Sequence, residues 1–139
     1  MKEVTYNSEG FGIKTVCEML NIGRQTLHYW RDVLYPDGRS NKFSSYELLF
    51  LRIIKEFVHF KGQKIGDFSG VDWDEFAIEL SKFPPFELAR YIFLWEPAEK
   101  KVFIYQSGDS SIKETRSSRK TELEEIVNEH INKLFNFGV

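Results

Sequence analysis

One short segment of the sequence, residues 24–31, is rich in long polar side chains of the kind that contact nucleic acids. Arginine can donate two hydrogen bonds to guanine, and glutamine can bond adenine in the same two-pronged way. Arg24 and Gln25 therefore supply base contacts if their helix enters a major groove, which is about 12 Å wide. At helical spacing His28 lies on the same face. The other polar residues of the segment are better placed for phosphates: Thr26, Tyr29 and Arg31.

Two short helices joined by a glycine-containing turn are predicted to position this segment. Apolar residues recur at helical spacing over residues 13–20, which favours a first helix. Asn21-Ile22-Gly23 then indicates a tight turn, because Asn and Gly tolerate the left-handed backbone conformation. A second helix is expected over residues 24–33, with Leu27 and Trp30 facing inward. Two short helices joined in this way form the helix-turn-helix pattern.

A hairpin and a longer helix are predicted to follow. Pro36-Asp37-Gly38 is a strong turn signal, and a short hairpin around it would form a wing. The wing would carry three polar side chains to the DNA backbone or minor groove: Arg39, Asn41 and Lys42. The longer helix is expected from about residue 45 to residue 60, with one further helical turn over residues 65–68.

Two sequence signatures indicate capped helix starts. Thr15 is followed three residues later by Glu18, and Ser44 is followed three residues later by Glu47. In a capping box the hydroxyl accepts a hydrogen bond from the third helical amide, and the carboxylate accepts one from the amide of the cap residue. We therefore expect both pairs to cap their helices.

The string Thr26-Leu27-His28-Tyr29-Trp30, preceded by residues 13–25, resembles the helix-turn-helix of MerR-type regulators. That family has Thr-Leu-Arg-Tyr-Tyr at the centre of its recognition helix. Residues 39–48 are similar to the family's wing and to the start of the helix after it. Residues 61–65 are similar to the glycine-containing turn that ends that helix. The likeness covers about residues 11–68, and it implies a winged helix-turn-helix domain that binds double-stranded DNA.

Two positions depart from the family pattern. His28 stands where the family usually has arginine, which implies that one phosphate contact is either weakened or dependent on pH. Trp30 replaces a tyrosine and is interpreted as a core anchor. The family dimerises through a C-terminal helix that directly follows the winged domain, whereas here a helix and a hairpin intervene.

The second half of the sequence predicts a helix, a β-hairpin and a final helix. The first of these is expected over residues 73–82, stopped by Pro84-Pro85. Residues 91–95 and 102–105 are rich in β-branched and aromatic residues, which favours a hairpin. After a polar linker, the last helix is expected over residues 120–137.

Two apolar groups in this half leave alternatives open. The last helix carries an apolar stripe that either dimerises the protein or packs within the chain: Leu123, Val127, Ile131 and Leu134. The many aromatic residues between positions 73 and 105 indicate a packed core or a subunit interface in preference to a ligand pocket, because aromatic rings usually fill both.

Charge is unevenly divided along the chain, whose formal net charge is −2. Residues 1–66 hold 10 basic and 7 acidic residues, a formal charge of +3. Residues 67–139 hold 9 basic and 14 acidic residues, a formal charge of −5. This asymmetry suits a basic binding part joined to an acidic body.

Catalytic and metal-binding chemistry find little support in the sequence. The single cysteine, Cys17, excludes a disulfide within the chain and metal sites built from several cysteines. His59 and His130 have no second ligand at helical spacing, so neither a metal nor another cofactor is expected. No phosphate-cradling glycine loop and no Ser/His/Asp arrangement indicates an enzyme.

The sequence thus predicts a mainly α protein with some β structure (α+β). Residues 1–68 are expected to form the winged helix-turn-helix domain, and residues 69–139 a region for dimerisation or effector response. We expect a cytoplasmic, sequence-specific transcriptional regulator that binds double-stranded DNA as a homodimer and has no membrane partner. Two alternatives are a DNA-binding factor of a mobile element (excisionase, plasmid segregation or phage packaging subunit) and a protein-interaction adaptor built on a degenerate winged helix. A small-molecule effector stays open.

Overall fold

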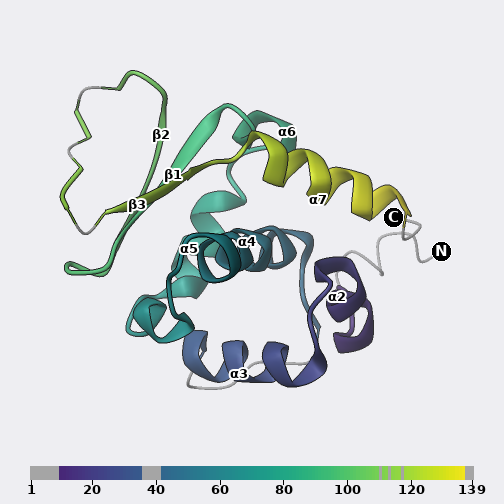
Figure 1. Ribbon diagram of the computed structural model, residues 1–139. Coiled ribbons are helices and arrows are strands. Elements are labelled where there is room, and N and C mark those ends of the chain that lie inside the picture. Colours follow the sequence, from purple (N-terminus) through teal and green to yellow (C-terminus); the bar gives the residue numbers. More distant parts are fainter. Residues whose placement is uncertain (1–9, 36–41, 110, 113, 117, 137–139) are drawn as a thin grey trace.

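The computed structural model describes residues 10–35, 42–109, 111–112, 114–116 and 118–136 of the 139-residue chain (Figure 1). The described part has a mixed α+β fold, in which helices surround a central helix and a three-stranded antiparallel sheet lies on one side. The expected combination of mainly helical structure with a little β structure is confirmed at this level.

The first two helices form where the sequence predicts them. Helix α2 covers Ile13–Leu20 and helix α3 covers Arg24–Leu34. Between them Asn21 adopts the left-handed conformation, with φ 56° and ψ 50°. The amides of Asn21 and Ile22 donate to the carbonyls of Glu18 and Cys17, which closes the end of α2. The turn therefore changes the direction of the chain and sets α3 against α2.

The start of α2 differs from the expectation. Gly12, and not Thr15, is the N-cap residue, and it has no side-chain hydrogen bond. The capping box predicted for Thr15 and Glu18 is therefore wrong, because Thr15 already lies inside the helix.

A backbone bridge instead fixes the entry to α2. Phe11 and Phe43 exchange two backbone hydrogen bonds, of 2.7 and 2.9 Å, so the chain enters the helix from a paired position. Gly10 precedes this bridge with φ +76°, and a Cβ atom there would overlap the carbonyl group of Phe43. Glycine is the residue type that fits both conditions.

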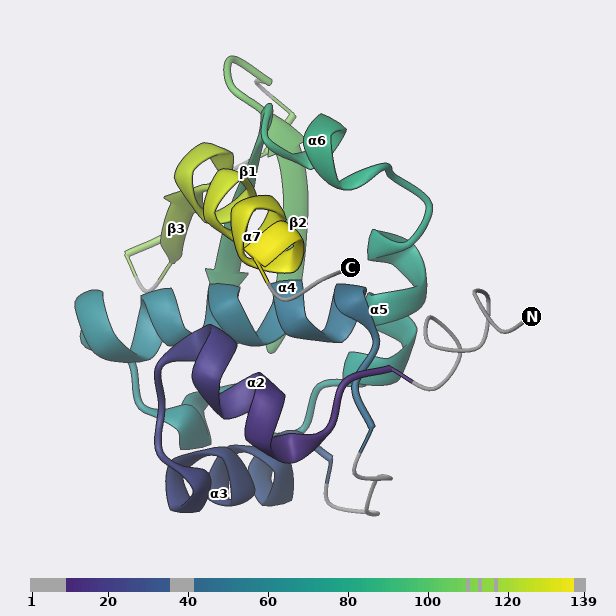
Figure 2. The same cartoon turned by 90° about the vertical axis from the view of Figure 1, so that its right-hand side faces the viewer.

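Helix α4 (Ser45–Lys55) is the central helix of the molecule and continues into the π-helical turn η1 (Glu56–Phe60). Its predicted start is confirmed, because the Ser44 hydroxyl accepts from the Glu47 amide and the Glu47 carboxylate accepts from the Ser44 amide. Every residue of α4 from Glu47 to Ile54 is buried. In Figure 2, α4 runs across the middle of the molecule, with α2 and α3 on one side and α7 on the other.

Short helices lead from α4 to the sheet. They are η2 (Ile65–Phe68), α5 (Trp73–Leu80) and α6 (Pro85–Leu88). The turn predicted over residues 65–68 is confirmed, and the helix predicted over 73–82 ends two residues early. Pro85 stands at the first position of α6, where its missing amide costs no helical hydrogen bond. The proline pair therefore starts α6, whereas α5 has already ended at Leu80.

The sheet contains the predicted hairpin and one strand that was not predicted. Strands β1 (Tyr91–Glu96) and β2 (Lys101–Gln106) pair as expected. Strand β3 (Arg119–Glu122) pairs with the other edge of β1, giving the order β2-β1-β3. Helix α7 covers Glu124–Asn136, so the expected helical start at residue 120 is wrong. The backbone of these residues pairs with β1 before the helix begins.

Aromatic side chains from both halves of the sequence fill one core. Phe50 of α4 stacks on Trp73 of α5, with ring centroids 4.6 Å apart. Phe68 of η2 stacks on Trp95 of β1, with centroids 4.8 Å apart. Except for Leu94 and Tyr105, the buried hydrophobic residues from Val16 to Val127 belong to a single cluster. The boundary expected near residue 68 therefore does not separate two independent cores.

The apolar stripe of α7, together with Leu123 just before the helix, contributes to the same core. Leu123 and Val127 have no exposed surface, and Ile131 and Leu134 pack on the cluster while partly buried. Of the two alternatives, packing within the chain accounts for these side chains. Leu123 and Val127 are already enclosed by the rest of the chain, whereas Ile131 and Leu134 keep some exposed surface. The expected dimer contact through this stripe stays a prediction.

Candidate nucleic-acid interface

Helix α3 has one buried face and one exposed polar face. Its inner residues, Leu27, Trp30 and Leu34, are at most 2% exposed. The exposed side chains are those predicted for base and phosphate contacts, together with one acidic residue: Arg24, Gln25, His28, Tyr29 and Asp32. In both views α3 lies at the edge of the molecule farthest from α7 and the sheet (Figures 1 and 2). The polar face is therefore available to a partner as large as a nucleic acid.

The inner face of α3 is fixed by packing from several elements. Leu27 and Trp30 belong to the core, and the His59 ring of η1 meets the Trp30 ring edge-on at 5.8 Å. Gly23 is the N-cap of α3, and no described side chain accepts a hydrogen bond from the first amides of the helix. No acidic residue lies in its first turn. These amides, at the positive end of the helix, can donate to an anion such as a phosphate.

The predicted phosphate contacts on α3 differ in exposure. The Tyr29 side chain is 58% exposed, whereas Thr26 and Arg31 are half-buried. The Arg31 guanidinium lies 5.5 Å from the centroid of the Phe43 ring, within the range of a cation–π interaction. Arg31 thus helps to hold the residue at the end of the predicted hairpin, and it is less accessible to a partner than Arg24.

The predicted wing can be placed only at its end. Arg39 and Asn41 lie outside the described residues. Lys42 is exposed, and the next residue, Phe43, is buried and bridged to Phe11. The exposed Lys42 therefore lies directly beside the Phe11–Phe43 bridge, which fixes the start of α2.

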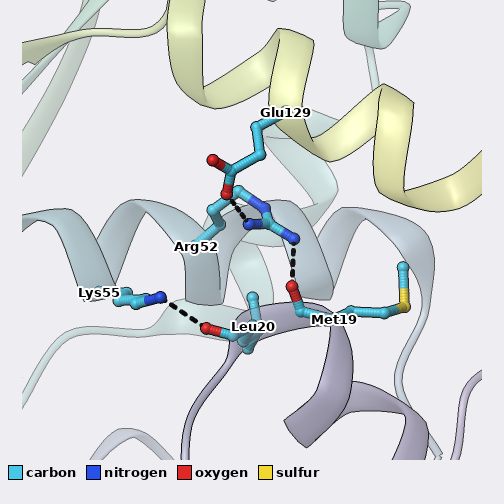
Figure 3. A network of polar contacts seen from close by, with 5 residues as sticks. All are labelled: Met19, Leu20, Arg52, Lys55 and Glu129. Atoms are coloured by element: carbon cyan, nitrogen blue, oxygen red, sulfur yellow. Dashed lines mark hydrogen bonds and ion pairs between the residues drawn. The ribbon is translucent and has the colours of Figure 1, made fainter.

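A network of cations and carbonyl oxygens that the sequence did not reveal holds the end of α2 (Figure 3). Arg52 of α4 is 5% exposed, and its Nη2 donates to the Met19 carbonyl at 2.9 Å, while its Nη1 pairs with Glu129 of α7. Lys55 Nζ donates to the Leu20 carbonyl at 2.6 Å. These are the last carbonyls of α2, which no helical amide can satisfy and which carry the negative end of the helix dipole. The network thus joins α2, α4 and α7.

The same burial shifts the pKa values of this network. Burial lowers the pKa of Arg52 below its ordinary value, and the adjacent Glu129 opposes that shift. Burial, and then the charge of Arg52, lower the pKa of Lys55. Burial, and then Arg52, lower the pKa of His130 on α7 to about 4. His130 is therefore neutral at pH 7, beside a positive charge.

Removal of Glu129 tests how far this network stabilises the fold. We expect Glu129→Ala to lower the free energy of unfolding by about 2 kcal/mol, because Arg52 stays buried and loses its counter-charge. The double variant Arg52→Met/Glu129→Ala should recover at least half of that loss, since it removes the buried charge as well. Urea unfolding monitored by circular dichroism measures both values.

Asn128→Ala, which truncates an exposed neighbour on α7, is the matched control and should change stability by less than about 0.5 kcal/mol. If Glu129→Ala matches this control, Arg52 does not depend on its partner.

A signal for Arg52 was present in the sequence but was not recognised. Arg52 is the one charged residue in the apolar segment Leu48-Leu49-Phe50-Leu51-Arg52-Ile53-Ile54. A helix formed by this segment is apolar on every side, so the Arg52 side chain has no solvent-exposed face on which to lie. A charged residue in such a run predicts a buried ion pair or carbonyl contact. Its partners, Met19 and Glu129, lie 33 and 77 residues away, and the pattern around Arg52 does not identify them.

Other candidate groups are less distinctive. Cys17 is half-buried against the core, and burial raises the pKa of its thiol. Within the described part of the chain, no three His, Cys, Asp or Glu side chains gather in a way that could hold a metal ion. None of the described helices combines the length and apolar character needed to cross a membrane. Comparisons with protein-family models, curated proteins and solved structures found no match.

Proposed function

We propose that this protein binds double-stranded DNA as a sequence-specific transcriptional regulator of the winged helix-turn-helix type, without catalytic activity. The observation that carries the proposal is the outward face of α3, where Arg24, Gln25 and His28 are exposed on a helix whose opposite face is buried. A helix held by its inner face can enter a major groove without rearranging, so its outer side chains reach base edges in a fixed register.

Two side chains at the start of α3 would read bases. Arg24 suits the O6 and N7 atoms of guanine, and Gln25 suits the N6 and N7 atoms of adenine. Each such pair discriminates against a wrong base by about 1–3 kcal/mol. The uncapped amides at the same end of α3 would bond a phosphate and so set how far the helix enters the groove.

The remaining contacts would fix the protein on the DNA backbone. Tyr29 and Thr26 are on the part of α3 that would face phosphates, and His28 is exposed on the same helix. The segment with Arg39, Asn41 and Lys42 would serve as the wing. Such contacts add affinity and salt dependence more than sequence preference.

The proposed regulator acts as a homodimer, but not through Leu123 and Val127. Both are buried within the chain, so a dimer must use other side chains, such as Ile131 and Leu134, which keep some exposed surface. Sedimentation equilibrium over a range of concentrations measures the stoichiometry directly. A monomer at every concentration, free and with DNA, would contradict this part of the proposal.

A salt titration tests the DNA contact itself. Affinity for a random-sequence duplex should fall steeply with salt, with a slope of log K against log salt of about −0.9 for each phosphate contacted. No measurable binding at low salt would rule out the proposal and favour a protein-binding adaptor. Mapping bound sites on genomic DNA then separates a promoter role from that of a mobile-element factor.

The variants Arg24→Ala and Gln25→Ala test the reading of bases. Each should lower the preference for a duplex selected from a random library over a non-selected duplex by about 5- to 150-fold, the equivalent of about 1–3 kcal/mol. Non-specific affinity should fall much less. Competition binding by fluorescence anisotropy measures both quantities.

Lys101→Ala is the matched control, because Lys101 is an exposed cation on β2 and not on α3. It should leave the preference unchanged. Full sequence preference in both α3 variants would mean that another surface reads the DNA.

A further inference from the structure

A groove of about 440 Å³ lies on another side of the molecule, between η1 and the start of α7. We refer to it as the η1–α7 groove. One wall, from α4 and η1, carries three cationic residues, Arg52, Lys55 and Lys61, with the single carboxylate of Glu56. The opposite wall, from β3 and α7, carries only carboxylates among its charged residues: Glu122, Glu124, Glu125 and Glu129. The two walls thus have opposite signs of charge.

Apolar surface lies between these walls. Phe60, the last residue of η1, is 72% exposed and lines the groove. Ile126 of α7 also lines it and is 7% exposed. Large aromatic side chains are usually buried, so an exposed ring beside a groove is a surface available to a ligand.

The backbone that presents Phe60 is itself unusual. The π-helical form of η1 has longer hydrogen-bonded turns than an α-helix, and such turns are frequent at functional sites. Helix α4 is buried on all sides from Glu47 to Ile54, and the π-helical turn ends with His59 and Phe60 exposed. The change of helix type therefore coincides with the edge of the groove.

The basic wall also has a donor without an acceptor. Arg52 is buried and lines the groove, and its Nε has no hydrogen-bond partner among the described residues. This Nε atom is itself enclosed, so Arg52 acts on the groove through the positive charge of its guanidinium. Lys55 and Lys61 add positive charge on the same wall. This wall is therefore suited to a carboxylate.

A ligand with one kind of charge would suit only one wall. Arg52 and Glu129 already pair with each other, which leaves Lys55 and Lys61 on one wall and three carboxylates on the other. An anion would approach the lysines but face these carboxylates, and a cation would approach the carboxylates but face the lysines. A molecule that carries both charges matches both walls and orients itself between them. The volume of the groove lies within the range of about 300–1,000 Å³ typical of small-molecule sites.

We infer that the η1–α7 groove binds a small zwitterion of amino-acid or dipeptide type, its carboxylate toward Lys55 and Lys61 and its ammonium toward Glu122 and Glu125. An apolar side chain of the ligand packs on Phe60 and Ile126. This inference is independent of DNA binding, because α3 contributes no residue to the groove.

A matched set of dipeptides tests the two charges separately. The probes are Ala-Leu, its N-acetyl form, which lacks the ammonium, and its C-terminal amide, which lacks the carboxylate. NMR titration of the full-length protein should give saturable shifts with Ala-Leu, localised to groove residues, with a Kd of about 1 mM or lower. Each blocked form should bind at least about tenfold more weakly. Equal binding of all three probes, stronger binding of a blocked form, or no saturable binding of Ala-Leu overturns the inference.

Substitutions in the walls locate the site. Lys61→Gln and Glu125→Gln, both at exposed positions, should each weaken binding of Ala-Leu at least about fivefold. Lys101→Gln and Glu99→Gln, an exposed pair on the hairpin, are the matched controls and should leave it unchanged. Equal loss in the controls and the wall variants places the binding elsewhere and overturns the assignment.

Discussion

Replacement of Trp73 by alanine is expected to lower the free energy of unfolding by about 3–5 kcal/mol. Trp73 is 1% exposed and stacks on Phe50, and its ring also lies 5.9 Å from that of Trp95. Its indole Nε1 donates to the Phe68 carbonyl at 2.8 Å. The truncation therefore leaves a cavity and an unsatisfied carbonyl at the point where helices and sheet meet. Urea unfolding followed by circular dichroism measures the loss.

Two variants separate the contributions at this position. Trp73→Phe keeps an aromatic ring but removes the hydrogen bond, and should lose about 1–3 kcal/mol. Ile78→Ala, on the same helix but 61% exposed, should change stability by less than about 0.5 kcal/mol. Equal effects of Trp73→Ala and Ile78→Ala would contradict the packing described for α5.

The remaining tryptophans show whether the two halves unfold together. In Trp73→Ala, Trp30 reports on α3 and Trp95 on the sheet, since the chain has three tryptophans. A further Trp95→Phe change leaves Trp30 as the single probe, and a further Trp30→Phe change leaves Trp95. A single shared core predicts that the two fluorescence transitions coincide with each other and with circular dichroism.

The second large effect is on the pH dependence of stability. His130 is 1% exposed, and burial, reinforced by Arg52, lowers its pKa to about 4 from the ordinary value of 6.5. Between these two values the unfolded chain takes up a proton that the folded chain does not. Stability therefore falls as the pH is lowered from about 6.5 to 4, by about 3 kcal/mol from this residue. Urea unfolding at several pH values measures the slope.

Neutral substitutions show how much of that slope belongs to His130. His130→Gln cannot take up the proton, so its stability should fall about 3 kcal/mol less than the wild type over the same pH range. His59→Gln changes an exposed histidine and should keep the wild-type slope. Equal slopes for His130→Gln and the wild type would mean that His130 does not carry the effect.

Local sequence signals predicted the elements whose formation depends on residues only a few positions apart in the chain. The apolar spacing over residues 13–20 and the Asn21 turn gave α2 and the start of α3, because turn chemistry and helical periodicity act within a few residues. The Ser44 capping box and the β1–β2 hairpin are local in the same way. The capping prediction at Thr15 failed because the bridge between Phe11 and Phe43 sets where α2 begins.

Contacts between distant residues account for what the sequence did not reveal. Strand β3 is a short polar segment with one β-branched residue, Thr121, and it becomes a strand because β1 offers a free edge. The stripe of α7 was compatible with a dimer or with internal packing, since periodicity records that a face is apolar but not what covers it. Glu129 and Arg52 likewise meet only in the folded chain.

The candidate interface was predictable to the extent that it lies on one helix. Helical spacing placed Arg24, Gln25 and His28 on the face opposite Leu27, and the exposures in the structure agree. Spacing alone did not distinguish Tyr29, which is exposed, from Arg31, which packs on Phe43. Whether that face binds DNA stays a prediction.

The enclosure of Leu123 and Val127 has a consequence for how the protein is made. The N-terminus of a chain emerges from the ribosome first, and domains generally fold as units once enough of their sequence has emerged. Here the side chains that close the core around α4 come from the last helix described. During synthesis, the core around α4 is therefore complete only after α7 has left the ribosome. A chain terminated before residue 123 would expose apolar surface and become a target for chaperones and proteases.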